Sequence, residues 1–269
     1  MAKVKFRADQ LVCEQGLADT SERAKRLVMA GLVRVVADGR ETAVDKPGQM
    51  FPAGTVFVVE QGERYVSRGG GKLETAIEAF GLDVSGMVAL DAGASTGGFT
   101  DCLLQHGAAK VYAVDVGTAQ LHEKLRADAR VVSMEQVNLR LAPRDLLPEP
   151  VDIVVADVSF ISLTKVLPAC VRFLKPGGLV AVLVKPQFEL SPDKVGRGGV
   201  VREEAHRQEA IARVTEFARQ ELGLAHRGVV PSKVKGPKGN QEYMAVFSLA
   251  ETEPVTPPSP GAAPSLPTD

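Results

Sequence analysis

The segment from residue 88 to residue 104 constrains the fold more than any other part of the chain. An apolar run ends at the acidic Asp91, three glycines follow within a few residues, and residues 99–104 have the pattern of a helix. Glycine lets the backbone approach a ligand closely, and a helix N-terminus offers unpaired N–H groups. We therefore expect a strand, a tight turn and a helix that together form a ligand cradle.

The spacing of these glycines separates two classes of cofactor. The pattern D-x-G-x-x-x-G-G differs from the G-x-G-x-x-G of dinucleotide enzymes, which disfavours an NAD-dependent oxidoreductase. It resembles the first motif of S-adenosylmethionine (SAM) methyltransferases. A purely structural turn is the alternative. The cofactor contacts expected here are Gly93, Ser95, Thr96, Gly97 and Gly98, with Asp91 near the methionine amine.

From residue 87 onward the chain alternates between strand and helix patterns. Apolar runs at residues 110–115, 130–133, 151–157 and 179–184 are separated by segments of helical length, which predicts a doubly wound, Rossmann-like parallel sheet in an α/β fold. Helices are expected at 73–80, 168–174 and 203–222, with a turn at 175–178. Residues 226–230 and 243–249 are expected to form an antiparallel hairpin around a basic loop.

Charged residues stand where several of these strands end. Asp91, Asp115, Asp157 and Lys185 each follow an apolar run, and ligands of parallel sheets bind beyond the carboxyl ends of the strands. The carboxylate of Asp115 is expected to bind ribose hydroxyls. A lysine at the end of a buried strand is unusual, because an ammonium group is costly to desolvate. A structural Lys–Asp ion pair and a catalytic lysine both remain open for Lys185.

Residues 1–62 are expected to form a small α+β unit with helices at 8–15 and 22–30 and strands at 32–36 and 55–59. The order helix, helix, glycine, strand resembles the S4 RNA-binding domain. Clustered Lys and Arg suit RNA phosphates, although a solvated helix face is the alternative. The candidate RNA-binding residues are Lys3, Lys5, Arg7, Arg23, Lys25, Arg26, Arg34 and Arg68.

Length and composition limit the number of domains, the location and the kinds of site that are expected. A chain of 269 residues allows one large domain and a small one, and no apolar run approaches the roughly 20 residues of a membrane helix. Residues 1–10 lack a signal-peptide segment, so a cytoplasmic location is expected. The three cysteines and four histidines indicate neither a disulfide framework nor a metal site. Residues 63–71 are expected to be a linker, 72–250 the catalytic domain, and the Pro-rich 251–269 a disordered tail.

Five longer motifs resemble the TlyA family of rRNA 2′-O-methyltransferases, often mislabelled haemolysins. The motifs are SRG at 67–69 with Lys72, DAGASTGGFT at 91–100, VADVSFISL at 155–163, LVKPQFE at 183–189 and GNQEY at 239–243. The resemblance runs from about residue 3 to 250. It implies an S4 domain fused to an FtsJ-like methyltransferase domain, with SAM as cofactor and ribosomal RNA in ribosomal subunits as partner. A cytidine of 23S rRNA is the implied target, with 16S rRNA left open.

The same resemblance implies a catalytic set of Lys72, Asp157, Lys185 and Glu242. Methylation of a ribose 2′-OH requires in-line attack and a group that accepts the hydroxyl proton. Lys185 is the expected base, with the carboxylates orienting the two lysines. Phe160 is expected to pack against the cofactor or the substrate base, with a place in the apolar core as the alternative. Base amino-methyltransferases carry a proline-containing motif where this chain has DVSF, which favours a ribose oxygen as target.

Two hypotheses from other functional classes of protein remain open. A membrane-active haemolysin is disfavoured because no strongly amphipathic cationic segment is present; leakage of liposomes by the purified protein would support it. A non-catalytic RNA-binding ribosome-assembly factor would keep its cellular function after Lys185→Ala. The oligomeric state does not follow from the sequence.

Overall fold

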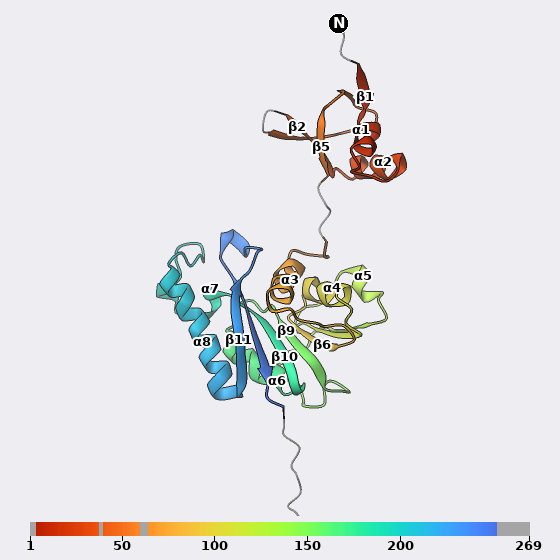
Figure 1. Cartoon of the computed structure of the whole chain (residues 1–269). Coiled ribbons are helices and arrows are strands. Elements are labelled where there is room, and N and C mark those ends of the chain that lie inside the picture. The colour runs from red at the N-terminus through yellow and green to blue at the C-terminus, as the bar shows by residue number, and fades with distance from the viewer. Residues whose placement is uncertain (1–3, 38–39, 60–63, 252–269) are drawn as a thin grey trace, which may run out of the picture. The chain divides into compact units, whose positions relative to one another are not determined.

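A computed structural model describes residues 4–37, 40–59 and 64–251 (Figure 1). The chain divides into two compact units, residues 1–64 and 65–269. Lys3, most of the expected 251–269 tail and residues 60–63 lie outside the described residues. Among the described residues, no helix combines the length and the apolar character that a bilayer span requires.

The first unit is a small α+β unit, as its patterns predict. The helix α2 begins after Thr20, whose side chain accepts a hydrogen bond from the backbone N–H of Arg23 at 3.2 Å. Val12, Val28 and Phe57 are among its buried core residues. Three short strands were not predicted, namely β1, β3 and β4. The elements are β1 Lys5–Arg7, α1 Ala8–Glu14, α2 Ser21–Met29, β2 Val33–Ala37, β3 Arg40–Ala43, β4 Met50–Pro52 and β5 Val56–Val59, with sheet orders β3-β2-β5 and β1-β4.

The second unit contains a seven-stranded sheet of order β11-β12-β10-β9-β6-β7-β8. The strands from β10 to β8 run parallel, whereas β12 pairs antiparallel with both β10 and β11. The predicted parallel sheet and its closing hairpin are therefore confirmed. The strands are β6 Val88–Ala92, β7 Lys110–Val114, β8 Val131–Met134, β9 Val151–Ala156, β10 Leu174–Val184, β11 Leu224–Pro231 and β12 Tyr243–Leu249.

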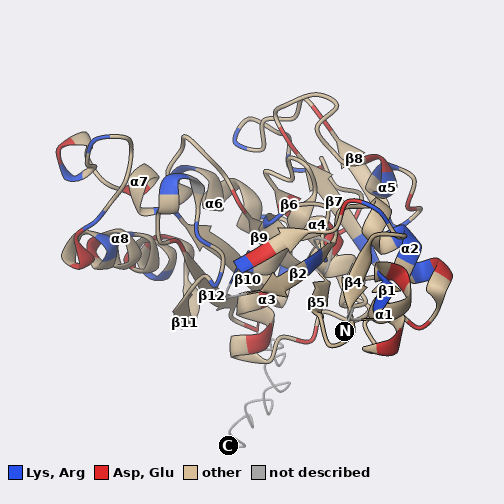
Figure 2. Ribbon diagram, turned by 90° about the horizontal axis from the view of Figure 1, so that it is seen from above, with Lys and Arg blue, Asp and Glu red and all other residues tan. Residues whose placement is uncertain are grey.

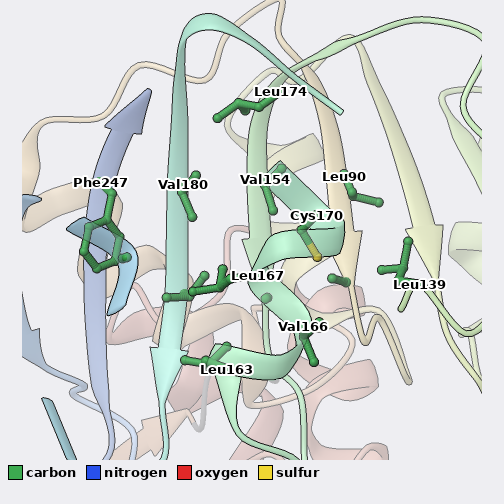
Figure 3. Packing of buried hydrophobic residues seen from close by; sticks show 14 of the residues in the cluster. Leu90, Leu139, Val154, Leu163, Val166, Leu167, Cys170, Leu174, Val180 and Phe247 are labelled. Atoms are coloured by element: carbon green, nitrogen blue, oxygen red, sulfur yellow. The ribbon is translucent and has the colours of Figure 1, made fainter. Parts of the chain in front are cut away.

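Helices cover both faces of this sheet. The helices α6 (Leu163–Val171) and α8 (Glu204–Leu222) pack on the face that carries Leu90, Val154 and Val180 (Figure 3). The helices α3 (Gly69–Phe80), α4 (Gly98–Gln105) and α5 (Glu123–Arg126) cover the face that carries Ala89 and Ile153. Because successive residues of a strand point to opposite faces, each apolar strand contributes to both cores.

Three local expectations were wrong. The helix α3 begins at Gly69 rather than at residue 73, and the ring of Tyr65 packs where a Cβ of Gly70 would otherwise lie. The helix α6 covers 163–171 rather than 168–174. The strand β10 begins at Leu174, so it includes the expected turn at 175–178, and its pairing with β9 shifts register between Leu174 and Leu179. A short helix α7, Pro186–Glu189, was not predicted.

Candidate active site

Four charged side chains from different elements meet at the carboxyl end of the parallel strands. Lys72 lies in the first turn of α3, Asp157 and Lys185 directly follow β9 and β10, and Glu242 directly precedes β12. Nζ of Lys72 lies 2.7 Å from Oε2 of Glu242 and 3.9 Å from Oδ2 of Asp157. Nζ of Lys185 lies 2.5 Å from Oδ1 of Asp157. The structure thus brings together the four residues expected as a catalytic set.

The four charges alternate between anion and cation. They lie in the order Glu242, Lys72, Asp157, Lys185, so two anions face two cations. Both lysines and Glu242 are buried, and Glu242 has no exposed surface. Removing charges from water is costly, so each ammonium group needs a partner of this kind. Nζ of Lys185 also donates a hydrogen bond to Oγ of Ser159 at 2.8 Å. A Cβ at Gly236 would overlap the carboxylate of Glu242, so a glycine there permits the close approach of the β11–β12 loop.

The glycine turn lies beside this cluster. Gly97 precedes α4 with a φ of 97°, and a Cβ at this position would overlap Leu121 and Leu125. Asp115 follows β7, and its two carboxylate oxygens accept hydrogen bonds from the backbone N–H groups of Ser95 (2.8 Å) and Gly117 (2.7 Å). The carboxylate is therefore held at a fixed place next to the turn.

Two cavities meet at the turn and share Gly93, Ser95, Asp157 and Ser159. The first, of about 500 Å³, is also lined by Thr96, Gly98, Lys72, Lys185, Arg68 and Lys235. The second, of about 540 Å³, is also lined by Asp115, Val116, Asn138 and Phe160. Each volume falls in the range of about 300–1,000 Å³ that is usual for small-molecule sites. The two cavities together therefore extend from Asp115 to the lysine cluster.

Asp91 lies behind the turn and lines neither cavity. It is fully buried; Oδ2 accepts a hydrogen bond from Oγ1 of Thr100 at 2.7 Å, and Oδ1 has no hydrogen-bond partner among the described residues. Burial, with the nearby charge of Asp157 adding to it, raises the pKa of Asp91 to about 7. Its expected contact with a cofactor amine stays a prediction.

The raised pKa of Asp91 predicts a pH-dependent stability. The folded state holds the proton more tightly than the unfolded chain, whose carboxyl titrates near 3.8. The free energy of unfolding should therefore decrease as the pH rises from 3.8 to about 7, and level off above that. Urea unfolding of the wild type and of Asp91→Asn, at about pH 5 and about pH 8, measures the effect. Asn cannot ionise, so this variant should lose less stability between the two pH values; equal losses would contradict the assignment.

Phe160 is the most exposed large apolar residue of the site. Its side chain is 91% exposed, its φ is 64°, and its ring centroid lies 5.2 Å from that of Phe188. The apolar core alternative is therefore wrong. The ring lies at the wall of the second cavity, where a ligand can reach it.

Sequence reasoning missed several residues that line or support the site. Ser159 is bonded to Lys185, and Lys235 lines the first cavity. Val116 and Asn138 follow β7 and β8, so their position after strand ends was the available signal. Glu189 had no such signal: it is buried, and its carboxylate accepts hydrogen bonds from Oγ of Ser162 (2.5 Å) and the N–H of Leu163 (2.8 Å). Burial raises the pKa of Glu189.

The candidate RNA-binding residues are distributed over both units. In the first unit, basic residues lie on α2 (Figure 2), where Arg23 and Lys25 form exposed ion pairs with Asp19 and Glu22. Such exposed pairs contribute little to stability. Arg7 instead forms a two-bond ion pair with the buried Asp9, at 2.9 and 2.7 Å, and so helps to hold this unit together. Lys5 lies on β1, Arg26 on α2 and Arg34 on β2, whereas Arg68 lines the first cavity of the second unit.

Comparison with known proteins agrees with this geometry. The FtsJ-like methyltransferase family model matches residues 65–249. A 16S/23S rRNA (cytidine-2′-O)-methyltransferase TlyA of Mycobacterium tuberculosis is 45% identical over 238 residues, which are 88% of this chain and 87% of the relative. Hemolysin A of Brachyspira hyodysenteriae is 39% identical over 249 residues, 91% of this chain and 100% of the relative. A solved structure from Streptococcus thermophilus that carries a hemolysin name has a TM-score of 0.69 and 47% identity, and the match covers 93% of this chain and 90% of that one.

The seven-stranded sheet, the charged cleft at its carboxyl edge and the family match define the second unit as an FtsJ-like methyltransferase domain. Since the similarity to TlyA proteins extends over most of the chain, the resemblance expected from the five motifs is confirmed. The chain belongs to the TlyA family.

Proposed function

We propose that the protein transfers a methyl group from SAM to a ribose 2′-OH of ribosomal RNA. The observation that carries the proposal is the buried cluster of Lys72, Asp157, Lys185 and Glu242, which borders the glycine-turn cleft. The relative from M. tuberculosis is named for cytidine methylation of 16S and 23S rRNA. On that basis a cytidine of 23S rRNA is the expected target, with 16S rRNA as a second candidate.

The residues of the cleft fit SAM. Asp115, fixed by two backbone N–H groups, can accept hydrogen bonds from ribose hydroxyls. Gly93 and Gly98 line the cleft without side chains, which leaves the backbone of the turn open to a ligand. The buried Oδ1 of Asp91, which lacks a partner among the described residues, lies behind the same turn. When bound, SAM supplies an electrophilic methyl group.

The chain's own residues position the alcohol and take its proton. We assign the role of proton acceptor to Nζ of Lys185, which lies at the wall of the first cavity. This nitrogen accepts the hydroxyl proton as a neutral amine, so its ammonium proton must first leave to water. Asp157 and Ser159 fix the position of this nitrogen through contacts of 2.5 and 2.8 Å. Glu242 holds Lys72 at 2.7 Å, so that the second cation faces Asp157 from the other side. This arrangement orients the acceptor for in-line attack.

The experiment that tests the proposal measures transfer of labelled methyl from SAM to ribosomal RNA and ribosomal subunits, followed by mapping of ribose methylation. RNA from cells with and without the protein should differ at one or a few 2′-O positions. Binding of S-adenosylhomocysteine, measured by calorimetry, tests the cofactor site separately. Absence of transfer to RNA, free and in subunits, together with absence of binding heat, would contradict the proposal.

Phe160 is expected to contact the base of the target nucleotide. Stacking of a base on an aromatic ring contributes about 1–3 kcal/mol, so Phe160→Ala should lower kcat/KM for RNA by roughly 5- to 150-fold. Because the side chain is 91% exposed, thermal stability should not change. Phe160→Trp should keep most of the activity, and since the chain contains no tryptophan its fluorescence would report RNA binding directly. Equal kcat/KM values for the wild type and Phe160→Ala would contradict this role.

A further inference from the structure

A third cavity adjoins the second one, since Arg140, Phe160 and Ile161 line both. Its volume is about 500 Å³. Its remaining walls include two further cations, one aromatic ring and one carboxylate, namely Lys165, Arg213, Phe188 and Glu189. We call it the flanking groove. It contains neither the glycine turn nor the lysine cluster, and the assigned reaction does not use it.

The flanking groove is positively charged at its exposed surface. Arg140 and Lys165 are exposed, and their side chains form no ion pair or hydrogen bond with any residue that the structure describes. Nη1 of Arg213 donates to the backbone oxygen of Glu189 at 2.8 Å. The carboxylate of Glu189 is buried and its two oxygens accept hydrogen bonds from Ser162 and Leu163, so it forms no ion pair with either exposed cation. Two further acids lie near Arg213 on α8: Glu209, which pairs with Lys194, and the exposed Glu216.

An aromatic pair lies beside these cations. The rings of Phe160 and Phe188 meet at 5.2 Å with an interplanar angle of 50°, and Phe188 is only half-buried. Cations next to exposed aromatic rings are the features that bind single-stranded nucleic acid, through phosphate contacts and base stacking. Double-stranded RNA does not offer unstacked bases to such a groove.

We propose that the flanking groove binds the nucleotide next to the methylated one, with its phosphate on Arg140 and Lys165 and its base against Phe188. This proposal rests on the proposed function, because it places the neighbouring ribose at Lys185. Phe160 then separates two successive bases, since it lines both the cleft and the groove. The enzyme would therefore require an unpaired dinucleotide, rather than a single displaced nucleotide.

The test compares the full-length wild type with Arg140→Ala/Lys165→Ala. The matched control is Arg219→Ala/Arg227→Ala, which removes two exposed arginines that line none of the three cavities. The first double variant should raise KM for ribosomal RNA about tenfold, the effect of losing roughly 1.4 kcal/mol, with kcat changed less. Binding of a fluorescent single-stranded RNA oligonucleotide should weaken, and the slope of log Kd against log salt should fall by roughly 0.7 for one lost phosphate. Phe188→Leu should weaken single-strand binding and leave its salt slope unchanged.

The outcomes separate this proposal from the function on which it rests. If the wild type methylates RNA but the Arg140/Lys165 variant matches the control pair in KM and salt slope, the flanking groove is not an RNA site and the proposed function stands. If the wild type does not methylate RNA, the proposed function fails; the oligonucleotide measurement then decides separately whether the groove binds RNA. Equal loss of affinity for single-stranded and duplex RNA would overturn the assignment to an unpaired nucleotide.

Discussion

Lys185→Met is expected to lower kcat for RNA methylation by about 10²- to 10⁴-fold, the usual contribution of a positioned acid–base group. The variant keeps most of the aliphatic stem and removes the nitrogen that contacts Asp157 at 2.5 Å and Ser159 at 2.8 Å. The affinity for S-adenosylhomocysteine should remain, because the glycine turn and Asp115 are unchanged. Single-turnover transfer of labelled methyl, with calorimetry for the cofactor product, measures both quantities.

Lys233→Met is the matched control for this prediction. Lys233 is an exposed lysine whose ion pair with Glu78 lies on the surface, and it lines neither the cleft nor the flanking groove. The Lys233→Met variant should keep the wild-type rate of methyl transfer. If Lys185→Met also kept that rate while remaining folded, Lys185 would have no part in the reaction, and the structural ion pair would be the correct interpretation.

The second large effect concerns folding. Glu242→Ala should lower the free energy of unfolding by about 3–5 kcal/mol, because it leaves the buried ammonium of Lys72 without its partner at 2.7 Å. For a unit of this size the melting temperature should fall by on the order of 10 °C. Glu209→Ala, which removes an exposed partner of Lys194, should cost less than about 1 kcal/mol. Thermal and urea unfolding provide the comparison.

A double variant separates charge burial from catalysis. Lys72→Met/Glu242→Leu replaces the buried pair by apolar side chains, an exchange that is often neutral or stabilising. It should recover most of the stability that Glu242→Ala loses, yet methyl transfer should stay low. A stable double variant with wild-type activity would remove this pair from the catalytic set. A double variant as unstable as Glu242→Ala would show that the pair is not the source of the lost stability.

Local patterns predicted the main sheet well, because its central strands are buried on both faces. Continuous apolar runs such as that of β9, each followed by a turn and a helix, left few alternatives. The short strands β1, β3 and β4 escaped prediction because they have only three or four residues, most of them exposed, and so show no clear alternation. The early start of α3 escaped prediction because its first three residues are glycines, which have a low helix propensity. A side chain at Gly70 would overlap the ring of Tyr65, a tertiary contact that local patterns do not reveal.

The candidate site was predicted as a set of residues but not as a geometry. The rule that strand ends converge placed Asp115, Asp157 and Lys185 together. It could not show that Asp91, which also ends a strand, is turned into the core beside Thr100. Nor could it find Glu189, whose partners Ser162 and Leu163 lie 26 to 27 residues away in the chain. Contacts of this kind depend on the packing of α6 against α7 and leave no local periodicity.

The position of Glu242 has a consequence for protein synthesis. This residue comes directly before β12, which is inserted between β10 and β11, although Lys72 is translated some 170 residues earlier. A nascent polypeptide that has emerged only as far as α8 therefore lacks the anion that faces Lys72. Such a chain cannot assemble the charged cluster, so under the proposed function an unfinished copy would lack the residues assigned to methyl transfer.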